Sequence, residues 1–151
     1  ERKLEIMQDS HVGANAVIGA VILILAKVTM LGSFSPALLG PLLFTMYVVT
    51  RTLMVIYILM FPNARPGGLG EMFKTGGKPV YLVLALLFCA ALLFWTGPVF
   101  CRLALITCIP CIAIAFYLMW GLGGLTGDTL GFLTECGNIV VLFLAGFLLR
   151  L

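Results

Sequence analysis

Long apolar segments alternate with short polar or glycine-rich segments along the whole chain. Each apolar segment is close to the ~20 residues that a helix needs to cross a ~30 Å hydrocarbon layer. A lone strand in lipid would leave its backbone donors and acceptors unsatisfied, so each segment is expected to be a helix. The pattern predicts an all-α fold, a polytopic transmembrane bundle of about five spanning helices in a single membrane domain, residues 1–151. The expected spans are 12–31, 38–61, 80–95, 99–120 and 130–151.

Composition supports a membrane protein. Apolar residues make up 62% of the chain and charged residues 10%, against about half and about a quarter in soluble domains. The net charge of +3 is scattered along the chain, which excludes the basic patch of a nucleic-acid-binding protein. The five cysteines lie in apolar runs, and the C-x-x-C of Cys108 and Cys111 has no partner pair, so packing is the favoured interpretation.

Positive residues predict the orientation of the bundle, because Lys and Arg near short loops favour the cytoplasmic side. Five crossings place the start of the chain and the polar connection 62–79 on one side. The other side holds Arg102 and Arg150, with Lys27 expected to snorkel outward from the end of the first span. The segment 9–11, the loop with Arg65 and the turn 123–129 should therefore share the cytoplasmic face. The five positive residues on that side are Arg2, Lys3, Arg65, Lys74 and Lys78.

The turn before the last span is the first candidate site. Its glycines let backbone N–H groups approach a ligand, and a helix N-terminus favours an anion, so the turn suits a phosphate or a phosphate-bound metal. Alternatively, the glycines only make a tight turn, and Asp128 or Thr129 caps the helix. The turn lacks the lysine of a P-loop. Its candidate residues are Gly123, Gly124, Thr126, Gly127, Asp128 and Thr129.

Arg51 lies near the middle of the second span, where an arginine costs about 2.5–3.5 kcal/mol. Glu135, expected about one turn into the last span, is one candidate counter-charge, and Asp128 is another. The other interpretation is that the guanidinium enters a polar cavity and meets an anionic substrate, because it matches phosphate geometry. Arg65 is either a topology signal that contacts lipid phosphate or a second phosphate ligand.

Asp9, Ser10 and His11 directly precede the first span. Asp9 and Ser10 are ordinary N-cap residues. His11 is the only histidine, which excludes a multi-histidine metal site within this chain. Carboxylates beside glycines and arginines suit metal-assisted phosphoryl transfer, in which positioning and charge neutralisation do most of the work.

Four segments, in order and spacing, resemble the cobalamin synthase family: residues 4–13, Arg51, residues 61–70, and residues 123–131 with Glu135. The resemblance covers the whole chain but only the C-terminal part of a family member. It implies a membrane transferase of cobalamin (vitamin B12) biosynthesis that joins adenosylcobinamide-GDP to α-ribazole or α-ribazole 5′-phosphate, releases GMP and uses Mg²⁺. It also implies the prokaryotic cytoplasmic (inner) membrane, and it leaves a homo-oligomer open.

The resemblance also implies roles for the matched positions. Asp128 and Asp9 would hold Mg²⁺ or orient the attacking ribose hydroxyl, and Glu135 is a third candidate catalytic residue. Arg51 and Arg65 would contact phosphate oxygens, and the glycine turn would supply backbone donors. The substrate-binding candidates are Arg51, Arg65, Ser10, Gly123, Gly124, Thr126, Gly127 and Thr129.

The chain departs from the family pattern in three places. The aspartate-rich motif expected upstream is not in these residues, so we expect the chain to lack part of the site. His11 stands where arginine is common, and Asn138 stands where a second acidic residue is common. The alternatives are a small transporter, with Arg51 and Glu135 along its pathway, or a non-catalytic membrane subunit. A transporter would place polar residues through its full depth, often with an internal repeat, and the sequence has neither.

Overall fold

The computed structural model describes residues 13–64 and 79–149, which form five helices. Within these two ranges the only β pairing is a single bridge between Asn63 and Leu125. The helices are α2 (Ala14–Gly32), α3 (Pro36–Met60), α5 (Pro79–Thr96), α6 (Pro98–Leu122) and α7 (Gly127–Leu148). Each predicted span overlaps one of them over most of its length, so the all-α bundle is confirmed.

Four helices, α2, α3, α6 and α7, are long and apolar enough to cross a membrane, and α5 is a shorter apolar helix. Their sequences place Pro36 and Pro98 in the first turns of α3 and α6, where the missing N–H costs no hydrogen bond. Many large apolar side chains lie on the outside of the bundle, as expected of a surface that faces lipid rather than water. The fold is therefore that of an α-helical membrane protein.

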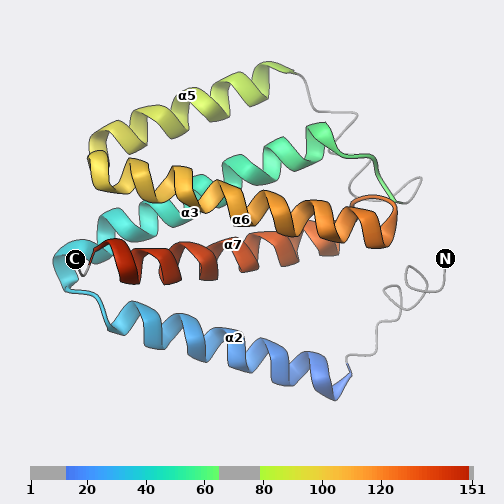
Figure 1. Ribbon diagram of the computed structural model, residues 1–151, viewed down its shortest axis with the longest axis horizontal. Helices are drawn as coiled ribbons and strands as arrows, with labels where there is room; N and C mark the ends of the chain where they lie inside the picture. The colour runs from blue at the N-terminus through green and yellow to red at the C-terminus, as the bar shows by residue number, and fades with distance from the viewer. Residues whose placement is uncertain (1–12, 65–78, 150–151) are drawn as a thin grey trace.

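The helices run back and forth, so their ends gather at two ends of the bundle (Figure 1). The start of α2, the end of α3, the start of α5, the end of α6 and the start of α7 lie together, and we call this the loop end. The closest packing joins α6 with α7 and α3 with both α5 and α7, whereas α2 packs mainly against α7. The helix ends that flank the three predicted site segments therefore share one end of the bundle, whereas residues 9–11 and Arg65 themselves lie outside the described residues.

The core sits where α3, α6 and α7 meet. One cluster of buried side chains surrounds Tyr57 toward the loop end, and a second surrounds Leu42 and Leu142 toward the opposite end. Between them α3 and α7 come very close, because a Cβ on Gly137 would lie 2.8 Å from Cγ2 of Thr50. Small residues permit such approaches in membrane bundles, where packing replaces the hydrophobic effect. This contact fixes the relative position of α3 and α7.

The predicted boundaries differ from the observed ones by one to three residues, and two of these differences affect the candidate site. α6 continues to Leu122 instead of residue 120, and α7 begins at Gly127 instead of residue 130. The polar residues of the turn therefore belong partly to the first turn of α7. As a result, Glu135 lies two turns into that helix, not one.

Candidate functional site at the loop end

The glycine turn is joined to the end of α3 by two backbone hydrogen bonds. The N–H of Ala64 donates to the carbonyl of Leu125 (2.9 Å), and the N–H of Leu125 donates to the carbonyl of Pro62 (2.8 Å). A Cβ at Gly124 would lie 2.4 Å from the backbone nitrogen of Ala64, so only glycine fits there. The structure thus brings the turn beside the residue that precedes Arg65; Arg65 itself lies outside the described residues.

Gly123 ends α6. It has φ +73°, a left-handed conformation that glycine adopts without strain, and its N–H donates to the carbonyl of Met119 (2.8 Å). That N–H is consequently engaged in the helix cap and is not a free donor for a ligand. Gly127, in contrast, is the exposed first residue of α7. Of the glycines proposed to approach a ligand, Gly123 and Gly124 thus have structural functions.

Thr126 and Thr129 form a reciprocal cap at the start of α7. The N–H of Thr129 donates to Oγ1 of Thr126 (3.2 Å), and the N–H of Thr126 donates to Oγ1 of Thr129 (2.8 Å). Both residues are buried. The alternative that Asp128 caps the helix is therefore wrong, whereas Thr129 does take part in the cap, as the partner of the N-cap residue Thr126. Both hydroxyls serve the helix start, which fixes the position of Asp128 between them.

Asp128 is exposed in the first turn of α7. Among the residues that the structure describes, it has no recorded hydrogen bond or ion pair. A carboxylate is favourable near the positive end of a helix. Glu135 follows seven residues later, which puts it on the same face of α7 about 10 Å further along the axis. The two candidate carboxylates therefore share one face of one helix.

Glu135 forms an ion pair with Lys27 of α2, through Nζ and Oε2. The side chain of Lys27 is 21% exposed and that of Glu135 is 45% exposed. The expectation that Lys27 snorkels outward is therefore wrong, and Glu135 is not the partner of Arg51. The sequence analysis did not include Lys27 among the site residues. The available signal was that Lys27 and Glu135 each lie inside an apolar span, where a charged side chain requires a partner.

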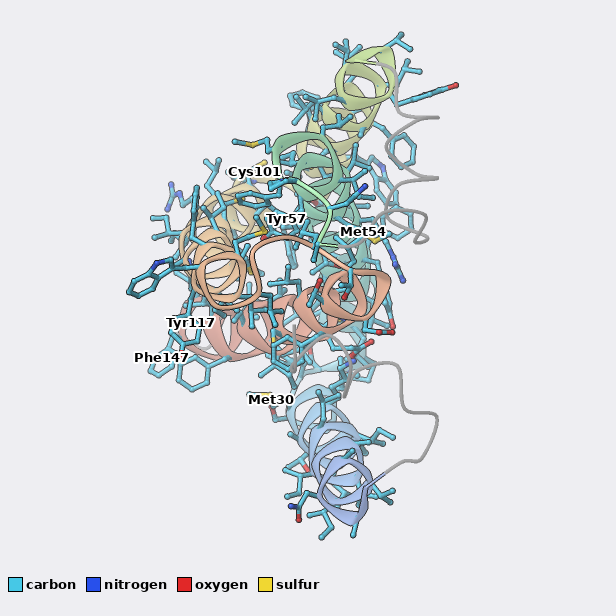
Figure 2. All side chains as sticks on the ribbon, turned by 90° about the vertical axis from the view of Figure 1, so that its right-hand side faces the viewer. Met30, Met54, Tyr57, Cys101, Tyr117 and Phe147 are labelled. Carbon is cyan, nitrogen blue, oxygen red and sulfur yellow. The ribbon has the colours of Figure 1, made fainter. Side chains whose placement is uncertain are left out.

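Arg51 is exposed on α3, and its Nη1 lies 3.6 Å from the sulfur of Met54. The hydroxyl of Thr134, next to Glu135 in α7, lies 3.9 Å from the same sulfur. Across residues 13–64 and 79–149 no carboxylate pairs with Arg51. We use the name polar flank for Lys27 and Glu135, which pair with each other, together with Arg51, Met54 and the buried Thr134, which are linked through the sulfur of Met54. Figure 2 shows Met54 on one side of the bundle and Tyr117 and Phe147 on the other.

A pocket of about 300 Å³ lies beside Arg51 between α3 and α5. Its walls are almost entirely apolar, and Arg51 is the one lining residue with a charged side chain. The lining residues are Tyr47, Val48, Arg51, Thr52, Val55, Ala85 and Phe88. Within the described residues, the structural ion pair expected between Arg51 and Glu135 or Asp128 is therefore not formed.

In the described ranges no three His, Cys, Asp or Glu side chains cluster in a way that could hold a metal ion. Mg²⁺ typically keeps several waters and binds through one or two carboxylates together with substrate phosphates. Asp128 fits such a role because it is exposed and unpaired, whereas Glu135 is held by Lys27. The other candidates before α2, Asp9 and Ser10, lie outside the described residues.

The fold and this polar end define a polytopic α-helical membrane protein with its candidate site at one end of the bundle. The chain belongs to the cobalamin-5-phosphate synthase family, whose model matches residues 1–146. The family resemblance noted in the sequence is thereby confirmed.

Individual relatives agree with this family assignment. An adenosylcobinamide-GDP ribazoletransferase of Syntrophobacter fumaroxidans is 38% identical over 94% of this chain and 58% of the relative. The protein of that name in Desulforamulus reducens is 36% identical over 95% of this chain and 58% of the relative. The chain thus spans less than two thirds of the length of these curated relatives. No solved structure matches the chain.

Proposed function

We propose that the protein carrying this chain is a membrane transferase of cobalamin biosynthesis. It joins adenosylcobinamide-GDP to α-ribazole or α-ribazole 5′-phosphate and releases GMP. In this reaction a ribose hydroxyl of α-ribazole attacks the phosphoryl group attached to cobinamide, the bond to the GMP portion breaks, and the hydroxyl proton goes to a base. The observation that carries the proposal is the family match over residues 1–146, together with relatives that bear the name of this activity.

Arg51 is the proposed phosphate ligand. It has no carboxylate partner in the described part of the chain, and it is exposed on α3 beside a pocket that it helps to line. A guanidinium donates two parallel hydrogen bonds to a phosphate, which favours an anionic ligand over a single point contact. The pairing of Glu135 with Lys27 supports this role, because it leaves the charge of Arg51 uncompensated by that carboxylate. Arg65 is proposed as a second phosphate ligand.

The two carboxylates of α7 receive different roles. Asp128 is open at the loop end, and we assign it to Mg²⁺ together with Asp9 and the substrate phosphates. Mg²⁺ would neutralise charge on the pyrophosphate when bound. Glu135, further along the same face, is assigned to orienting the ribose hydroxyl or accepting its proton. The capping pair of Thr126 and Thr129 keeps Asp128 at a fixed place in the first turn.

We also propose how the protein is oriented in the membrane and which part of the enzyme this chain represents. Both the positive-residue bias and the nature of the substrates favour a loop end that faces the cytoplasm in the prokaryotic inner membrane. The chain spans 58% of the length of the relatives from Syntrophobacter and Desulforamulus. We propose that it is the C-terminal part of the enzyme and that the aspartate-rich motif belongs to the remaining length.

The test is transfer in proteoliposomes with both substrates and Mg²⁺, using the protein at the full length of its gene product. GMP release and formation of the joined product are measured together. Asp128→Asn should abolish most of the transfer, whereas Arg102→Gln, an exposed charge at the opposite end of the bundle, should leave it unchanged. Full transfer by a folded Asp128→Asn protein would reject the role of Asp128, and the absence of any GMP release by the unmodified protein would reject the function.

A further inference from the structure

The way α2 is attached to the bundle differs from that of the other membrane-length helices. α2 has no buried residue. Its partly buried residues recur every three or four positions and so form one stripe, which faces α7, the helix it packs against. They are Leu23, Ala26, Lys27, Met30 and Leu31. Figure 1 shows α2 beside α7 and apart from the other helices.

Lys27 supplies the polar contact in this stripe. Its Nζ forms a salt bridge with Oε2 of Glu135 in α7. Moving a charge from water into an apolar surrounding carries a large desolvation penalty. Pairing the ammonium of Lys27 with the carboxylate of Glu135 offsets part of this penalty for both groups. The apolar contacts of α2 lie mainly toward its end, where Met30 and Leu31 pack against the cluster around Leu142.

The pair uses one carboxylate oxygen and leaves the other on the polar flank. Hydrogen bonding to Oε2 fixes the side chain of Glu135, which is nevertheless 45% exposed. Its exposed portion lies on the face of α7 that also carries Asp128. The neighbouring Thr134 contacts Met54, which in turn contacts Arg51. The carboxylate is therefore held at a defined place between the proposed phosphate ligand and α2.

We infer that Lys27 is a positioning residue, which holds the carboxylate of Glu135 on the polar flank and by the same contact ties α2 to α7. The positioning role rests on the proposed function, because it concerns the chemistry of Glu135. The tie between α2 and α7 rests only on the observed ion pair. Removing the partner that orients a metal-binding side chain typically lowers activity about 10- to 100-fold, and we expect a similar loss for the partner that orients Glu135. Lys27 touches Glu135 and not the reacting atoms, so its loss should lower kcat and leave KM unchanged.

Four variants test the inference in the full-length protein in proteoliposomes: Lys27→Met, Lys27→Arg, the exchange of the two charges (Lys27→Glu with Glu135→Lys), and Thr29→Val as a control on the exposed side of α2. Lys27→Met should lower kcat about 10- to 100-fold. Lys27→Arg should recover most of the rate, and Thr29→Val should match the unmodified protein. The exchange should not recover transfer, because the carboxylate then belongs to α2.

Two further measurements do not depend on transfer. Genetically encoded spin labels at the exposed positions Val17 and Phe132 report the distance between α2 and α7. Lys27→Met should broaden the distance distribution, and the charge exchange should narrow it again. Infrared difference spectra should show a shifted carboxylate band of Glu135 in Lys27→Met.

The results separate the two proposals. An unchanged carboxylate band in Lys27→Met, or an unchanged kcat in an active protein, would overturn the positioning role. Transfer restored by the charge exchange would also overturn it, because the pair would then act only as a tether. An unchanged distance distribution would overturn the tie. If the unmodified protein transfers nothing, the proposed function fails, while the distance and infrared measurements still decide the effect of Lys27.

Discussion

The hydroxyl of Thr50 donates a hydrogen bond to Oδ1 of Asn138 (3.2 Å) in the buried contact between α3 and α7. The two side chains are 2% exposed each, and the single hydroxyl proton of Thr50 is shared between Asn138 and the carbonyl of Met46 in its own helix (2.9 Å). Because Gly137 lies beside them, the two helices approach closely at this point. The polar pair therefore sets the register of α3, which carries Arg51, against α7, which carries Glu135.

Replacing Thr50 with Val should destabilise the folded protein. The change keeps the shape but leaves the Asn138 oxygen without this donor, at a cost of about 1–3 kcal/mol in the free energy of unfolding. Thermal unfolding in detergent should show a lower midpoint. Thr29→Val is the matched control, because Thr29 makes only an exposed bond to the carbonyl of Leu25. Equal midpoints for the two variants would contradict a stabilising role for the Thr50 and Asn138 pair.

Gly124→Ala should disrupt the loop end. A Cβ there would meet backbone atoms of Ala64 at 2.4 to 2.7 Å, and backbone cannot move aside as a flexible side chain can. We expect loss of most transfer activity and a lower unfolding midpoint, because the turn and the end of α3 must separate. The control is Gly131→Ala in the same region, where a Cβ meets nothing within 4 Å. A Gly124→Ala protein with normal activity and midpoint would show that the close approach is dispensable.

Tyr57→Phe should be neutral or should stabilise the protein by up to about 1–2 kcal/mol. The ring of Tyr57 is 4% exposed in the core, and its hydroxyl is buried without a hydrogen-bond partner in the described structure. Figure 2 shows the residue in the interior, between the helices. Removing the hydroxyl keeps the ring and its stacking on Phe61. Tyr117→Phe, at a side chain that is 74% exposed, serves as the control. A clear loss of stability in Tyr57→Phe alone would mean that the hydroxyl has a partner, such as a buried water.

Arg51→Gln should raise KM for the phosphate-bearing substrate and lower kcat/KM by about tenfold or more, the equivalent of at least ~1.4 kcal/mol of binding in the transition state. Arg51→Lys should recover only part of this, because an ammonium cannot donate two parallel hydrogen bonds. Steady-state transfer kinetics of both variants, beside Arg102→Gln, provide the measurement. If Lys at position 51 restored the full rate, a bidentate phosphate contact would be ruled out.

The hydrophobic pattern was sufficient for the helices and for their alternating direction, because burial in lipid requires long apolar segments with satisfied backbones. It also brought the glycine turn and the end of α3 to one end of the bundle, and the structure confirms this for Leu125 and Ala64. These features depend on segment length and order alone.

The pairing of side chains was less predictable. Whether Glu135 meets Arg51 or Lys27 depends on how each helix is rotated about its axis, and a uniformly apolar span contains little information about rotation. The start of α7 was placed three residues late for a different reason. The capping threonines resemble loop residues in the sequence, and only their reciprocal hydrogen bonds show that the helix begins there. The residues that were harder to assign are those whose function depends on orientation.

The two backbone hydrogen bonds between Leu125 and the end of α3 have a mechanical consequence. Because Leu125 is hydrogen-bonded to both Pro62 and Ala64, a displacement of the backbone at Ala64 would also displace the turn that precedes α7 and, with it, Asp128. The C-terminal end of α3 and the N-terminal end of α7 are thus coupled through the backbone. A substrate bound near the end of α3 would therefore influence the position of Asp128 at the start of α7, and the helices below would not have to move.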